Sequence, residues 1–274
     1  MTKLLLRGIS TLVLAATVCI WTGSARGDAD LPFAPYGELL DQHLVEYDLP
    51  GGGLISAFDY RAALDDPATP ELLARQSRLL AAFDRAQLDQ REAAIAFWTN
   101  AYNFFMIRFL LEQAAAAGEL AGSVRGYGSL VDPFALFKRA LFEVGGRTYS
   151  LCEIELDVLL GDEFAARGWK DARVHFMVNC ASVGCPPLRA VPYTATNVEA
   201  MMAENTRRAL DTPIHLRPEG ERLLVTSLFD WYAADFAAQN GSIEGFIRAH
   251  GSERARRRLE RAAGIAFIDY DWAL

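Results

Sequence analysis

The sequence predicts an α+β fold: a helix-rich single domain with a small mixed or antiparallel sheet. Long segments with apolar residues at helical spacing alternate with short β-type runs that meet at Gly-containing turns. The elements follow one another in an irregular order, which is typical of α+β folds rather than of repeated strand–helix units. Apolar residues make up 51% of the 274-residue chain, so a sizeable core can form.

Residues 1–27 have the features of a signal peptide. Lys3 and Arg7 precede an apolar stretch over 9–21, and Ala25-Arg26-Gly27, with small residues at its two ends, forms a cleavage signature. The apolar stretch is shorter than the roughly 20 residues that cross a bilayer. We therefore expect a periplasmic or secreted protein with no integral membrane span after signal cleavage.

The charge of the chain excludes one class of partner. The formal net charge is −8, and it becomes −11 once the three cationic side chains of residues 1–27 are removed. An acidic chain repels nucleic acid, so we expect no nucleic-acid partner. An envelope protein, a peptide or a polysaccharide remains as the expected partner. After the signal peptide we expect an N-terminal segment over 28–70 and a globular domain over 71–274.

The strongest helical pattern runs from Gln90 to Ala117 and is apolar on all sides, which predicts a central, buried helix. Asn100 and Asn103 are three residues apart and share one face of it. A buried amide without a partner costs about 1–3 kcal/mol. Either both amides hold neighbouring backbone groups, or one of them orients a catalytic imidazole or lines a substrate pocket.

Turn and capping signals predict several of the other elements. Gly145-Gly146 lies between two β-type runs and predicts a hairpin over 142–149. Ser150 and Glu153 match a capping box, which leaves Glu155 as the freer carboxylate of the helix that follows. The remaining expected elements are a hairpin of 214–216 with 223–226 and helices over 69–83, 134–142, 196–210, 229–238, 242–250 and 253–263.

The stretch 173–188 contains the chemistry-bearing residues. Alternation over 174–179 predicts a β-strand that brings Cys180 to its C-terminal end, followed by a tight turn of small residues. In one hypothesis Cys180 is a nucleophile, His175 its base, and Glu155 or one of the two Asn side chains orients the imidazole. Backbone amides after Cys180 would form an oxyanion hole.

The nucleophile hypothesis implies a class of reaction and requires that the side chains of His175 and Cys180 can meet. The class is amide or thioester acyl transfer, such as peptide hydrolysis or transpeptidation. The residue order is compatible with a papain-like arrangement, by analogy of fold alone. On one continuous strand His175 and Cys180 face opposite sides, so the strand must end or bulge before Cys180 for the two side chains to meet.

The alternative hypothesis is a non-catalytic binding domain for an envelope protein or polysaccharide. In it, Cys180 and Cys185 form a disulfide that fixes the turn, and His175 is a satisfied core residue. A zinc site is not expected, because the spacing of the two cysteines fits the usual ligand patterns poorly. No nucleotide-binding glycine frame is found, and no cofactor is expected.

Four segments carry a resemblance to a known family. The sequences FWTNAYN (97–103), YSLCEIE (149–155), ARVHFMVNCASVGCPPLRAVPYTATNVE (172–199) and DYDWAL (269–274) resemble the domain of unknown function 547 family. The resemblance implies an exported bacterial member and no particular activity. Family members usually have an acidic residue at the position of Cys152 and commonly a His at that of Leu156, so no role for that second His is expected here.

Overall fold

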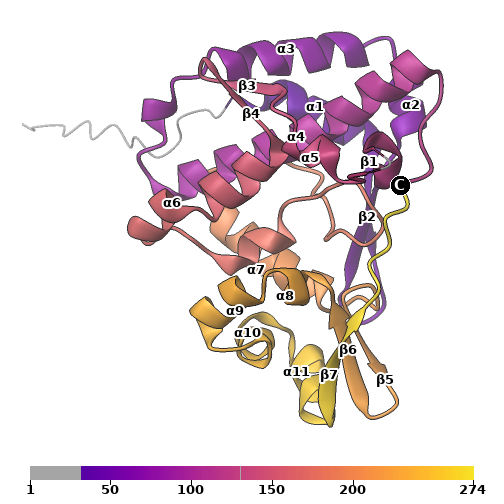
Figure 1. The fold of residues 1–274 in the computed structure, drawn as a ribbon, viewed down its shortest axis with the longest axis vertical. Helices are drawn as coiled ribbons and strands as arrows, with labels where there is room; N and C mark the ends of the chain where they lie inside the picture. Colours follow the sequence, from indigo (N-terminus) through magenta and orange to yellow (C-terminus); the bar gives the residue numbers. More distant parts are fainter. Residues whose placement is uncertain (1–31, 130) are drawn as a thin grey trace, which may run out of the picture.

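The computed structural model describes residues 32–129 and 131–274, and the expected signal peptide lies outside the described residues. Helices and three small sheets make up the described part of the chain, which confirms the helix-rich α+β fold (Figure 1). Among the described residues, no helix is both long and apolar enough to cross a membrane.

The elements come in two groups along the chain. The first comprises α1 (Ala34–His43), β1 (Leu44–Asp48), β2 (Leu54–Phe58), α2 (Tyr60–Asp65), α3 (Thr69–Ala81), α4 (Arg91–Ala117), α5 (Ala135–Lys138), β3 (Phe142–Val144), β4 (Arg147–Tyr149) and α6 (Asp162–Ala166). The second comprises α7 (Val198–Ala209), β5 (Leu216–Glu219), β6 (Arg222–Thr226), α8 (Leu228–Trp231), α9 (Ala233–Asn240), α10 (Ile243–His250), α11 (Glu253–Glu260) and β7 (Gly264–Ile268).

Helix α4 is the central element, as its composition predicts. Eighteen of its 27 side chains are buried, and they lie on all sides of the helix. The helix ends at Gly118, whose left-handed backbone (φ 81°) a side chain would disfavour. The position of α4 matters for the site, because the segments that carry the cysteines and His175 pack against it.

Two hydrophobic clusters form the core. The larger one surrounds α4 and includes side chains from the expected N-terminal segment, among them Phe33, Tyr36 and Leu39. The smaller one lies under the second group of elements and contains Phe176, Phe229 and many other buried side chains. The N-terminal residues that the structure describes are therefore part of the main core.

The two predicted hairpins are confirmed. Strands β3 and β4 pair antiparallel around Gly145-Gly146, and β5 and β6 pair antiparallel around Gly220. Strand β7 joins β6 in parallel, which makes the three-stranded sheet mixed. After β7 the chain returns to the first group of elements, where Ala273 forms a β-bridge with Ser123 (Figure 1).

The predicted strand over 174–179 is wrong. Residues Ala172–Phe176 form a 3-10 helix, here called η4, and the chain then continues through a turn without strand pairing. His175, Phe176 and Met177 are all buried, so the alternation in sequence does not reflect alternating faces. The predicted helix over 229–238 is also interrupted, at Tyr232, between α8 and α9.

Candidate functional site

The structure brings three of the predicted site residues to one pocket. Glu155, His175 and Cys180 line a cavity of about 430 Å³ that also has Cys185 in its wall. The rest of the wall is largely aromatic and includes rings from the C-terminal part of the chain. Because η4 replaces the predicted strand, the objection that His175 and Cys180 face opposite sides no longer applies.

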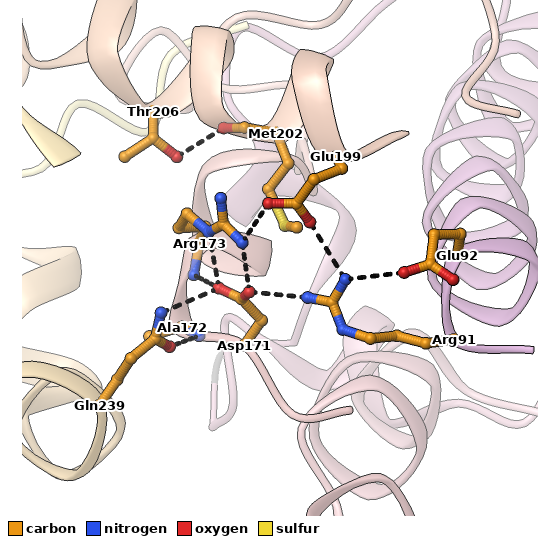
Figure 2. Close-up of polar contacts among 9 residues, drawn as sticks. All are labelled: Arg91, Glu92, Asp171, Ala172, Arg173, Glu199, Met202, Thr206 and Gln239. Carbon is orange, nitrogen blue, oxygen red and sulfur yellow. Dashed lines mark hydrogen bonds and ion pairs between the residues drawn. The ribbon is translucent and has the colours of Figure 1, made fainter. Parts of the chain in front are cut away.

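Helix η4, which carries His175, is fixed by a charged network (Figure 2). Asp171 caps η4 by accepting the backbone N–H of Arg173 at 3.0 Å. Its carboxylate also pairs with the guanidinium groups of Arg173 (2.6 Å) and Arg91 (2.9 Å). Glu199 bridges the same two arginines, at 2.8 and 3.0 Å. The network thus ties η4 to the first turns of α4 and α7.

Asp171 is nearly buried, which makes its partners decisive. Burial raises the pKa of this carboxyl group, but hydrogen bonds and charge from Arg173 outweigh burial and hold the pKa below its usual value. Gln239 of α9 adds a donor to Asp171 and accepts the N–H of Ala172. Helix α9, which also supplies Asp235, is thereby positioned against η4.

His175 lies between two carboxylates. Its Nε2 is hydrogen-bonded to Asp235 at 2.9 Å, and its Nδ1 is 3.7 Å from Glu155, longer than a hydrogen bond. Burial lowers the pKa of the imidazole, but the two negative charges outweigh burial and raise it. Lys170 pairs with Asp235, and Tyr232 stacks on the imidazole at 3.8 Å. A row of alternating cationic and anionic side chains results, and its Glu155 and His175 line one end of the pocket. The row runs in the order Lys170, Asp235, His175, Glu155.

The capping box that precedes Glu155 is confirmed. The N–H of Ser150 donates to Glu153 at 2.7 Å, and the N–H of Glu153 donates to the Ser150 hydroxyl at 3.1 Å. Residues Glu153–Leu159 then form a π-helix, a wider turn that often occurs at functional sites. Glu153 is used by the cap, and Glu155 on the same helix is left to line the pocket.

The turn after η4 presents Cys180 with a strained backbone. Ala181 has a φ of 67°, a left-handed conformation that costs a residue with a Cβ about 1–2 kcal/mol. The Asn179 side chain supports the turn, because it accepts the N–H of Ala181 and donates to the Pro186 carbonyl. Such strain concentrates at functional sites, where the surrounding structure holds it in place.

Cys180 and Cys185 form a pair of free thiols. Their sulfur atoms are 2.7 Å apart, and the Cys180 N–H donates to the Cys185 sulfur at 3.0 Å. The Ser182 hydroxyl lies 3.0 Å from the Cys180 sulfur and 3.4 Å from that of Cys185. The hydroxyl of Tyr270 donates to the Cys185 sulfur at 3.1 Å. Three hydrogen-bonding groups therefore gather around two sulfurs.

This arrangement separates the acidities of the two thiols. Burial raises the pKa of Cys185, but hydrogen bonds from Cys180, Ser182 and Tyr270 to its thiolate outweigh burial and lower the pKa to about 7. The hydrogen bond with Cys185 and burial raise the pKa of Cys180. Because the two groups titrate as a pair, about half of the molecules carry one negative charge and one proton on the pair at pH 7.

Residues 269–274, here called the C-terminal segment, hold Tyr270 against the thiols. The N–H groups of Val183 and Gly184 donate to the carbonyls of Ala273 (2.8 Å) and Asp271 (2.9 Å). A Cβ at Gly184 would lie 3.0 Å from the ring of Tyr270. A side chain at this position would force the ring of Tyr270 to shift, so glycine favours this close approach.

The expected oxyanion hole is not available from most of the turn amides. The N–H groups of Ala181, Val183, Gly184 and Cys185 donate to Asn179, Ala273, Asp271 and Ser182, respectively. Only the Ser182 amide of this turn has no acceptor among the described residues. These amides already donate hydrogen bonds, which hold the turn in shape and attach the C-terminal segment.

Asn100 and Asn103 lie outside the pocket, and their side chains form hydrogen bonds with backbone groups. Asn100 exchanges two hydrogen bonds with the N–H and carbonyl of Tyr193, at 2.9 and 2.7 Å. Asn103 donates to the carbonyl of Met177 and accepts the N–H of Asn179. Asn103 thus fixes the segment between His175 and Cys180, and neither amide contacts the imidazole.

Two further observations concern sulfur and metal chemistry. Cys152, the third free thiol, also lines the pocket, and burial together with the charge of Glu155 raises its pKa. No group of three or more His, Cys, Asp and Glu side chains in the described part of the chain is arranged to hold a metal ion.

Several residues of the site carry no recognisable signal in the sequence. Tyr270, Ser182, Asp235 and Tyr232 were not candidates, although Tyr270 lies in the segment DYDWAL that carried part of the family resemblance. Three of these four come from positions 50 to 90 residues beyond the cysteine turn. No local pattern indicates which distant side chain will reach the sulfurs.

The comparisons with known proteins identify a family and no activity. The family model described as "Protein of unknown function, DUF547" matches residues 86–209, which include Glu155, His175, Cys180 and Cys185 but not Asp235 or Tyr270. Searches of curated proteins and of solved structures found no significant match. Residues 86–209 of the chain thus match the DUF547 family.

Proposed function

We propose that the protein is a cysteine-dependent acyl-transfer enzyme or hydrolase that uses Cys180 as its nucleophile. The observation that carries this proposal is the position of the Cys180 sulfur, 2.7 Å from a sulfur whose pKa is lowered to about 7. Both sulfurs line the pocket that contains His175 and Glu155. Of the two cysteines, Cys180 is the more exposed and hence the better placed to meet a substrate.

The proposed first step moves a proton within the thiol pair. The Cys180 sulfur attacks the carbonyl carbon of an ester, thioester or amide, and its proton passes to the Cys185 thiolate. The bond from the acyl carbon to the leaving group then breaks, and the leaving group departs with a proton. In the second step water, or another acceptor, attacks the acyl carbon and gives its proton to His175, the carbon–sulfur bond breaks, and Cys180 takes its proton back from Cys185.

His175 receives a role different from that of a general base. Its raised pKa favours the imidazolium, and it makes no hydrogen bond to Cys180 in the structure. A protonated imidazole does not accept the thiol proton. We assign His175 the task of proton donor to the leaving group, through Nδ1, whose contact with Glu155 is loose at 3.7 Å.

The test is to trap the acyl-enzyme with an activated aryl thioester and to locate the acyl group by mass spectrometry. We expect acylation of Cys180 in the native protein and none at that position in Cys180→Ser. Cys152→Ala is the matched control, because this thiol lines the same pocket but has a raised pKa. Acylation of all three thiols at the rate of the unfolded chain would overturn the proposal.

One observation favours a second function. The same separation of 2.7 Å brings the sulfurs close enough to form a disulfide in an oxidising compartment, and the expected signal peptide is consistent with such a compartment. The pocket would then belong to a non-catalytic binding domain. Counting thiols in the exported, unfolded protein separates the two: three free thiols favour the enzyme, and Cys152 alone favours the binding domain.

A further inference from the structure

Arg125 is a cation of the pocket without an anionic partner. It lies in a short 3-10 helix, Val124–Tyr127, and lines the cavity. Its guanidinium lies 5.4 Å from the ring centre of Phe134 and 5.2 Å from that of Trp272. Among the described residues no carboxylate lies within ion-pair distance of it, whereas Lys138 of the same wall pairs with Asp132 at 2.7 Å and His175 lies between two carboxylates.

An aromatic wall connects this guanidinium to the thiols. Trp272 lies 4.5 Å from the ring of Tyr270, whose hydroxyl donates to Cys185. Trp231 stacks on Trp272, with ring centres 5.6 Å apart. The path from Arg125 to the sulfurs therefore runs along two successive rings of the C-terminal segment, which suits a flat or apolar group.

We propose that the pocket binds acyl compounds that carry a carboxylate at the end remote from the reacting carbonyl, with the carboxylate on Arg125. The position of the reacting carbonyl rests on the proposed function; the anion site does not. A guanidinium placed over two rings keeps its N–H groups available to bind a carboxylate in a bidentate manner. In a chain of net charge −8, such a cation is a local attractor for anions.

The charge at the other end of the pocket sets the orientation. Glu155 and the thiolate of the cysteine pair line the pocket there, while the cations Lys170 and His175 already face carboxylates, so a carboxylate entering that end would meet negative charge and no free cation. Like charges disfavour the reversed binding mode. The uncharged carbonyl end of the substrate therefore faces the thiols and the His175 row, and the anionic end faces Arg125.

The test compares two ligands of the same shape by titration calorimetry: terephthalamate, an aromatic amide with a carboxylate at its far end, and the neutral terephthalamide. We expect the native protein to bind terephthalamate about tenfold more tightly, since hydrogen bonds to charged groups contribute about 1.5–3 kcal/mol and Arg125 is exposed. Arg125→Gln should abolish the difference and leave terephthalamide binding unchanged.

Two further variants separate the possible failures. Arg167→Gln removes an arginine that also stacks on a ring, that of Trp169, but lies outside the pocket, and it should behave as the native protein. Cys180→Ser should keep the tenfold preference, because binding needs no thiol. A preference that persists in Arg125→Gln, or no binding of terephthalamate to the native protein, would overturn the inference. A preference without any acyl-enzyme would overturn the proposed function alone.

Discussion

Tyr270→Phe should raise the pKa of the thiol pair while leaving the pocket filled. The substitution removes only the hydroxyl that donates to the Cys185 sulfur at 3.1 Å. A hydrogen bond to a charged group contributes about 1.5–3 kcal/mol, and one pKa unit corresponds to about 1.4 kcal/mol. The pKa of about 7 should therefore rise by about 1 to 2 units, and the thiolate fraction at pH 7 should fall from about half to between a tenth and a hundredth.

The assay is a pH titration that follows the ultraviolet absorbance of the thiolate, with the alkylation rate of the folded protein as a second readout. Tyr232→Phe is the matched control, because this tyrosine lines the same pocket and makes no hydrogen bond to either sulfur. We expect the control to titrate as the native protein does. If Tyr270→Phe gave the native midpoint, the hydroxyl would not stabilise the thiolate and the reasoning would be refuted.

The same shift has a consequence for stability. The folded-state pKa of Cys185 lies below the ordinary value of 9.0, so the thiolate contributes stability that is fully present above pH 9 and is lost as the pH falls through about 7. In Tyr270→Phe the folded-state pKa moves back toward 9, and this part of the pH dependence should shrink. Urea unfolding at pH 7 and pH 9 measures the difference.

Three more predictions follow from buried contacts. Burial lowers the pKa of His215 to about 4, so the free energy of unfolding should fall by about 3 kcal/mol as the pH falls from 6.5 to 4. Urea unfolding should show a smaller fall in His215→Gln, and an equal fall in the two proteins would contradict this. Gly184→Ala should cost about 1–3 kcal/mol by overpacking against the C-terminal segment; thermal unfolding should show no comparable loss in Gly122→Ala, where a Cβ meets nothing within 4 Å. Asp171→Ala leaves two arginines without a buried partner and should lower the free energy of unfolding by about 3–5 kcal/mol. Glu199 is exposed, so Glu199→Ala should lower it by less than about 1 kcal/mol. Similar urea midpoints for the two variants would refute this contrast.

Elements with local signals could be predicted from the sequence. The hairpin at Gly145-Gly146 and the capping box of Ser150 and Glu153 each depend on residues a few positions apart, and both are found where expected. Helix α4 was predictable because its apolar surface leaves it no place except the core. Its last turn ends at Gly118, the first glycine after Gln90.

The stretch before Cys180 shows why the rest could not be predicted. Alternation of side chains indicates a strand only if one face is solvated, and here residues 174–178 are buried on both faces. The decisive contacts are tertiary: Asp171 caps η4, and Asn103 of α4 fixes the chain just before Cys180. The polar contacts of His175 depend in the same way on Asp235 of a distant helix.

The contact between Tyr270 and Cys185 can form only late in synthesis, because Tyr270 is added to the chain long after Cys185. Tyr270 follows Cys185 by 85 residues, so at about 5–20 residues per second the cysteine is made roughly 4–17 s before its donor. During that interval the thiol lacks the hydroxyl that acidifies it, and it reacts as an ordinary, mostly protonated cysteine. The nascent chain is thus spared a reactive thiolate until the C-terminal segment docks.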